Sequence, residues 1–143
     1  MIVLVQATVL TVGLDGKNEV LRELPIQLIK MRSGGQAARS LKNEKVNSVI
    51  SKWDLVDMKD GRFLKRLRAV KPDIPTIAFI RTGDRAQEIA ARGIGVYAVL
   101  TDETSDELFR ETVANVLGLK DVASIKEISP TKNSSYVKGR TTR

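Results

Sequence analysis

Short apolar runs alternate with longer amphipathic stretches from residue 35 to residue 117. The apolar runs are rich in β-branched side chains, as is typical of buried strands, and they cover 46–53, 74–80 and 96–100. The amphipathic stretches place apolar residues on one side, as a packed helix requires, and they cover 35–45, 61–71, 81–93 and 104–119. Strands and helices that alternate at this spacing predict a parallel sheet with helices on both faces.

The last two amphipathic stretches also carry signals for helix ends. Asp84 is placed to cap the first of them, with Gln87 three positions later, and Gly93 is placed to end it. Thr104 and Glu107 have the spacing of a capping box at the start of the second. Both stretches are therefore predicted to be helices rather than strands.

The first 34 residues are less regular. Residues 2–12 form one long β-branched run, and Asp15-Gly16 is a turn signal. A doubly wound fold places a helix after its first strand, but glycines interrupt the candidate stretch 7–24 and β-branched residues crowd it. A β-hairpin of two long strands fits this chemistry better. We therefore expect a hairpin in place of the first helix, with the helix as the alternative.

Such a hairpin would leave one face of the sheet bare or a long edge unpaired. Bare apolar faces and unpaired edges are usually covered by a partner or by another copy of the chain. The pattern therefore predicts a homodimer or a higher oligomer that forms through residues 1–34.

Composition fits one domain followed by a polar tail. The 143 residues are 42% hydrophobic and 29% charged, with a net charge of +7. Residues 119–143 hold six basic and two acidic residues, which supply +4, and the run 129–143 has almost no large apolar residue. We therefore expect a domain at 1–118 and a disordered basic tail at 119–143. The first ten residues are too short to span a bilayer and have no basic lead-in, so we expect no membrane association and a cytoplasmic location.

The sequence has no cysteine and no histidine. Disulfides and thiolate chemistry are therefore excluded, and the commonest general base and transition-metal ligand are absent. The missing histidine also argues against most hydrolase mechanisms. We expect neither a cofactor nor enzyme activity.

Three segments resemble the receiver domain of the two-component response regulators. "GGQAARSLKNEKVNSVISKW" (34–53) resembles its second helix and third strand, and "GIGVYAVLTDETSDELFRETVANVL" (93–117) resembles its fifth strand and last helix. "MKDGRFLKRLRAVKPDIPTIAFI" (58–80) resembles its third helix and fourth strand and is the most specific piece. The resemblance implies an α/β fold of the flavodoxin-like receiver type, with a doubly wound, mostly parallel five-stranded sheet.

In that family an acidic pair that holds Mg²⁺, a nucleophilic aspartate, a hydroxyl and a lysine together handle a phosphoryl group. None of the matching positions in this chain keeps its group. The acidic pair falls at Gln6 and Ala7, the aspartate at Trp53, the hydroxyl at Ile80, and the lysine at Leu100 or Thr101. The resemblance therefore implies a pseudo-receiver without phosphorylation, with no catalytic, cofactor-binding or metal-binding residues.

Asp54 is the carboxylate next to the position of the missing nucleophile. A shift of one residue would put Asp54 in place, but along a strand such a shift moves the side chain to the other face. It would restore neither the metal pair, the hydroxyl nor the lysine. Asp54, Asp57 and Asp60 could instead form a cation site, but a solvated acidic loop that caps the next helix is the simpler interpretation.

Without phosphorylation, the chain could still act through its surfaces. In the family, the fourth helix, fifth strand and fifth helix form the usual docking face. Here the resemblance places on that face Arg85, Glu88, Arg92, Tyr97 and Glu111. Trp53 is expected to pack inside the domain, with an exposed interface anchor as the alternative. We therefore expect a module for protein interaction or oligomerisation in signalling or assembly, with an unknown protein partner.

Three alternatives stay open. Arg62, Lys65, Arg66 and Lys71 could bind nucleic acid or another polyanion together with the tail, although no helix-turn-helix is evident. A small ligand could bind at the carboxyl ends of the strands, as in other open α/β sheets. The chain could also be a divergent active receiver that uses Asp54.

Overall fold

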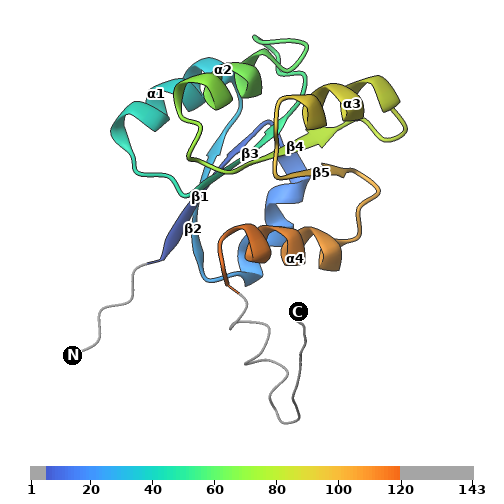
Figure 1. Cartoon of the computed structure of the whole chain (residues 1–143). Helices are drawn as coiled ribbons and strands as arrows, with labels where there is room; N and C mark the ends of the chain where they lie inside the picture. The colour runs from blue at the N-terminus through green and yellow to red at the C-terminus, as the bar shows by residue number, and fades with distance from the viewer. Residues whose placement is uncertain (1–5, 120–143) are drawn as a thin grey trace, which may run out of the picture.

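The computed structural model describes residues 6–119, which form a five-stranded sheet flanked by helices (Figure 1). The strand order is β2-β1-β3-β4-β5, and all neighbouring strands run parallel. The strands are β1 (Ala7–Val12), β2 (Ile26–Met31), β3 (Ser48–Lys52), β4 (Thr76–Ile80) and β5 (Ala98–Thr101). The parallel α/β sheet that the sequence predicted is confirmed.

Helices cover both faces of this sheet (Figure 1). On one face, α1 (Gly34–Asn43), α2 (Arg62–Val70) and α3 (Arg85–Gly93) share a core cluster with β1, β3 and β4. On the other face lie η1 (Asp15–Glu23), a 3-10 helix, and α4 (Asp106–Val116). The central strands are thus buried on both sides, which explains why their sequences are continuous apolar runs.

The predicted N-terminal hairpin is wrong. β1 and β2 run parallel over their whole length, whereas a hairpin joins antiparallel strands. The turn signal at Asp15-Gly16 begins η1, where Asp15 has a positive φ of 47°. Val20 and Leu21 of η1 are buried, so the apolar residues after the turn form the packed side of a crossover helix.

The length of the crossover explains why η1 is a 3-10 helix. The connection must run from the end of β1 back to the start of β2. Both strands have six residues, so this distance is about 20 Å, at about 3.3 Å per residue. Nine residues cover about 18 Å as a 3-10 helix but only about 13.5 Å as an α-helix. A short connection therefore favours the more extended helix.

The same crossover removes one of the two reasons for expecting self-association through residues 1–34, the bare sheet face. η1 and α4 together cover the sheet face that a hairpin would have left bare. A bare face therefore no longer supports an interface at this segment.

Two expectations fall partly or wholly outside the described residues. Of the basic tail at 119–143 only Leu119 is described, and residues 1–5 of the chain are not. Within residues 6–119, no helix has the length and apolar character needed to cross a membrane.

Candidate functional site

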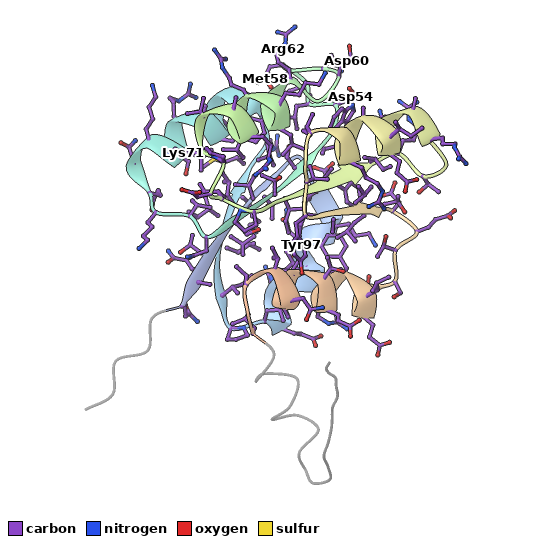
Figure 2. The ribbon with its side chains drawn as sticks, viewed as in Figure 1. Asp54, Met58, Asp60, Arg62, Lys71 and Tyr97 are labelled. Carbon is purple, nitrogen blue, oxygen red and sulfur yellow. The ribbon has the colours of Figure 1, made fainter. Side chains whose placement is uncertain are left out.

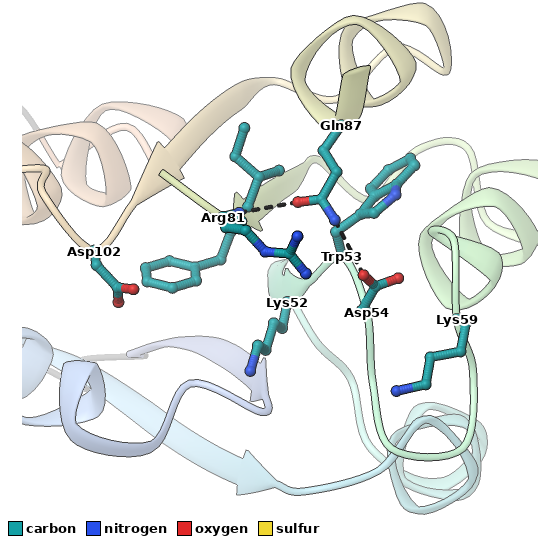
Figure 3. Close-up of a pocket in the computed structure, with 9 residues that line it drawn as sticks. Lys52, Trp53, Asp54, Lys59, Arg81, Gln87 and Asp102 are labelled. Carbon is teal, nitrogen blue, oxygen red and sulfur yellow. Dashed lines mark hydrogen bonds between the residues drawn. The ribbon is translucent and has the colours of Figure 1, made fainter. Parts of the chain in front are cut away.

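The carboxyl ends of β3, β4 and β5 surround a hollow of about 380 Å³ (Figure 3). This is the edge at which open parallel sheets bind ligands. The lining residues end or follow these strands or come from α3, and they are Lys52, Trp53, Asp54, Lys59, Phe79, Ile80, Arg81, Gln87 and Asp102. Three basic side chains thus stand with two carboxylates, whereas Mg²⁺ requires a set of oxygen ligands.

Trp53 is buried at this hollow, and the packing role expected for it is supported. It is 4% exposed and belongs to the core cluster under α1, α2 and α3. Gly61 permits this position, because a Cβ there would lie 2.3 Å from the indole ring. The ammonium of Lys65 lies 5.8 Å from the ring centroid, in a cation–π contact. The indole is therefore enclosed by the loop after β3 and by α2.

Asp54 lines the hollow, and both of its oxygens accept hydrogen bonds. Oδ1 accepts from the backbone N–H of Asp60 at 2.7 Å, and Oδ2 accepts from Nε2 of Gln87 at 3.0 Å. Gln87 in turn accepts from the backbone N–H of Arg81 at 2.9 Å (Figure 3). This chain of bonds ties the loop after β3 to the loop after β4, which gives Asp54 a structural role.

The neighbouring carboxylates do not join Asp54 in a cation site. The Asp57 carboxylate accepts hydrogen bonds from the backbone N–H groups of Gly34 (2.8 Å) and Gly35 (3.0 Å). These two bonds lower the pKa of Asp57, since they favour the charged form. The sequence suggested that this acidic loop caps the following helix, α2. Asp57 instead caps α1. Within residues 6–119, no group of three or more acidic side chains is placed to hold a metal ion.

The positions expected for the hydroxyl and the lysine carry packing and turn residues. Ile80 is buried in the core on the α1–α3 side, and Leu100 is buried on the opposite face of the sheet. The N–H of Thr101 donates to Oγ1 of Thr104 at 2.9 Å, and its own hydroxyl oxygen accepts from the N–H of Glu103 at 3.1 Å. Thr101 therefore stabilises the turn after β5.

The structure corrects the position of the expected acidic pair. Gln6 and Ala7 lie at the beginning of β1, at the opposite end of that strand from the hollow. The residues that follow the carboxyl end of β1 are Gly13, Leu14 and Asp15. Leu14 is buried, whereas Asp15 is exposed and lines a second hollow together with Asp54. The carboxylate of Asp15 is therefore present near this edge, although the resemblance implied that neither acidic residue of the pair is kept.

The expected docking residues lie on three elements near the β5 edge of the sheet, with α3 and α4 on opposite faces of the sheet. Arg85, Glu88 and Arg92 are on α3, Tyr97 precedes β5, and Glu111 is on α4. Glu88 and Arg92 pair at 3.1 Å, and Tyr97 is half exposed on the side of the molecule where α4 lies (Figure 2). Sequence reasoning missed two exposed apolar side chains on the same helices, Ile89 and Leu108.

The four candidate anion-binding residues do not form one patch. Arg66 and Lys71 line an apolar hollow between α1 and α2, whereas Lys65 lies over Trp53. Arg62 begins α2 and Lys71 follows its end, so they stand at opposite ends of that helix (Figure 2). The basic side chains on and beside α2 therefore lie at different places on the surface of the domain.

Part of the chain is similar in sequence to chemotaxis proteins. No protein-family model matches it. Over 79 residues it is 30% identical to a chemotaxis protein CheY homologue of Campylobacter jejuni, which covers 54% of this chain and 61% of that relative. The chain thus spans about three fifths of the length of the curated relatives that it matches.

Solved receiver structures match most of the fold. The signal receiver domain of an HD domain-containing protein from Pseudomonas fluorescens Pf-5 has a TM-score of 0.72 at 22% identity, over 82% of this chain and 99% of that chain. A CheY-like response regulator receiver domain protein from Methanospirillum hungatei JF-1 has a TM-score of 0.71 at 15% identity, over 83% and 99% of the two chains. The chain therefore has the flavodoxin-like fold of a response-regulator receiver domain.

Proposed function

We propose that this chain is a receiver-like domain that works without phosphorylation, as a protein-interaction module in signalling or assembly. One observation carries the proposal: Trp53, which the resemblance places at the position of the phosphorylated aspartate, is packed into the core. An indole has no carboxylate oxygen with which to attack a phosphoryl donor.

The surroundings of Trp53 support the same proposal. Lys52, Lys59 and Arg81 line the hollow, and positive charge at such a site opposes the binding of Mg²⁺. Both oxygens of Asp54 already accept hydrogen bonds from the protein. A phosphoryl group on Asp54 would have to break at least one of these bonds.

Exposed apolar side chains support the interaction role. Ile89, Tyr97 and Leu108 are each at least half exposed, and they lie on or beside α3, β5 and α4. We call this surface the α3–β5–α4 face; it consists of Arg85, Glu88, Ile89, Arg92, Tyr97, Leu108 and Glu111. Apolar groups with a polar surround are typical of protein-docking surfaces. We therefore assign partner binding to this face.

Thermal unfolding in MgCl₂ with beryllium fluoride, a mimic of the phosphoryl group, tests the proposal. A ligand that binds only the folded state raises the unfolding temperature, so an active receiver is stabilised. We expect this chain to unfold at the same temperature as in MgCl₂ with fluoride alone. A Mg²⁺-dependent rise that disappears in Asp54→Asn would refute the proposal and identify Asp54 as the phosphorylation site.

A further inference from the structure

A second concave surface lies between α1 and α2, and we call it the α1–α2 groove. It is a hollow of about 370 Å³ with an apolar floor that includes Leu41, Phe63 and Leu67. Val70 stands at its border and is 69% exposed. A hollow of this size and lining can accept apolar side chains from a partner.

The border of the α1–α2 groove is positively charged. Lys42, Arg66 and Lys71 line it, and none of them forms an ion pair within the described part of the chain. Neither α1 nor α2 contains an acidic residue that could neutralise this border. An occupant that fits the groove therefore combines apolar side chains with negative charge.

The outward side of α4 has this complementary character. Leu108 is 50% exposed, and the exposed residues Glu107 and Glu111 flank it. Arg110, the basic residue of this helix, turns toward η1, where its Nη1 donates to the carbonyl oxygen of Val20 at 3.5 Å. The outward surface of α4 is thus an apolar side chain in acidic surroundings.

These two surfaces lie on opposite faces of the sheet (Figure 1). α4 cannot reach the groove of its own chain, so the two can meet only between copies. We infer that α4 of one copy docks in the α1–α2 groove of the next copy, with Leu108 over the apolar floor and the two glutamates beside the basic border. Because the two surfaces differ, the contact is head-to-tail and can be extended by further copies.

This inference rests on the proposed function, because α4 belongs to the α3–β5–α4 face, and it identifies a second copy as a partner of that face. The contact consists of one leucine and a few exposed ion pairs. We therefore expect weak association, with a Kd on the order of 100 μM.

Sedimentation velocity of the full chain at low salt and rising concentration tests the inference. Val70→Asp places negative charge at the groove, and Leu108→Arg places positive charge on α4. Both positions are exposed, so the variants should keep the fold, as circular dichroism can check. Each variant alone should associate at least about tenfold more weakly. An equimolar mixture should form a one-to-one pair, because each variant retains the surface that the other lacks.

Val56→Asp is the matched control, because Val56 is also an exposed valine but belongs to neither surface. It should associate like the unaltered chain. If association survives Val70→Asp but is lost in Leu108→Arg, the head-to-tail contact is overturned. The α3–β5–α4 face would then be a symmetric docking surface. A mixture that forms no pair, or an unaltered chain that stays monomeric at about 1 mM, would also overturn it.

Discussion

Gly61 and Trp53 depend on each other for their positions. Gly61 has a φ of 71°, and any side chain there would meet the indole ring. Its backbone N–H also donates to the carbonyl oxygen of Trp53 at 3.0 Å. The loop after β3 therefore closes tightly over the indole.

Gly61→Ala should destabilise the domain by about 3 kcal/mol, because its methyl group adds a collision with Trp53 to the cost of a positive φ. Gly83→Ala is the matched control: Gly83 has a φ of 81°, but no atom lies within 4 Å of its Cβ position. That variant should lose only about 1 kcal/mol. Urea denaturation measures both losses, and equal values would contradict the tight packing of the indole.

Thr76 has a buried hydroxyl without a hydrogen-bond partner in the described part of the chain. Valine keeps the shape and removes the hydroxyl, so Thr76→Val should raise the free energy of unfolding by about 1 kcal/mol. Ser48→Ala should lower it by about 1 kcal/mol, because the hydroxyl of Ser48 donates to the carbonyl oxygen of Pro75 at 3.1 Å. Urea denaturation compares the two, and a destabilised Thr76→Val would show that its hydroxyl is in fact bonded.

At the scale of elements, helix starts show how far local signals reach. Asp84 caps α3 as predicted, since its carboxylate accepts from the N–H of Gln87 at 3.0 Å. α4 instead begins after Ser105, whose hydroxyl accepts from the first turn of the helix, while Thr104 bonds back to Thr101. Thr104 and Ser105 are both suitable N-cap residues in the sequence. The turn after β5 uses the hydroxyl of Thr104, so Ser105 caps the helix.

The crossover after β1 could not be predicted from local sequence. The turn signal at Asp15-Gly16 suits a hairpin and a helix start equally well, and the parallel pairing of β1 with β2 decides between them. The position of the acidic pair depends on where the apolar run at 2–12 ends, because the pair follows the first strand in the family. The resemblance places the acidic pair at Gln6 and Ala7, whereas β1 ends at Val12.

Asp57 stabilises α1 from the loop after β3, and this contact should depend on pH. Hydrogen bonds from Gly34 and Gly35 lower its folded-state pKa below the usual 3.8. The stabilisation is therefore complete above the unfolded-state pKa and is lost as the pH falls through the lower folded-state pKa. Asp57→Asn should cost about 0.5–1 kcal/mol at pH 7, because solvent screens this exposed cap.

Urea denaturation from neutral pH to about pH 2 checks this prediction. The unaltered chain should lose more stability on acidification than Asp57→Asn does. Asp73→Asn is the control, because it removes an exposed carboxylate to which no hydrogen bond is formed within residues 6–119. Identical acid profiles for the unaltered chain and Asp57→Asn would contradict the capping role.

At the scale of the whole molecule, the order of layers was predictable and the chemistry of the hollow was not. The layers follow from buried strands that alternate with amphipathic helices, and Trp53, directly after β3, packs as expected. The basic character of the hollow comes from residues such as Lys59 and Arg81, which lie after strand ends. Their convergence depends on loop paths, which carry no periodic signal.

Charge is distributed unevenly across the molecule, with basic α1 and α2 on one face of the sheet and an acidic α4 surface on the other. Self-association between these surfaces should weaken about tenfold when NaCl rises from about 50 mM to about 500 mM, because salt screens exposed charges. Sedimentation velocity at both salt concentrations measures the change. Association that strengthens with salt would point to an apolar contact elsewhere.

Whether the chain accepts a phosphoryl group decides between a pseudo-receiver and an active receiver. Intact-mass spectrometry after incubation with acetyl phosphate and MgCl₂ makes this measurement, with a phosphorylatable receiver treated in parallel. We predict that the mass of this chain does not change while the control receiver gains a phosphoryl group. A Mg²⁺-dependent adduct on this chain, mapped to Asp54, would contradict the proposal that it works without phosphorylation.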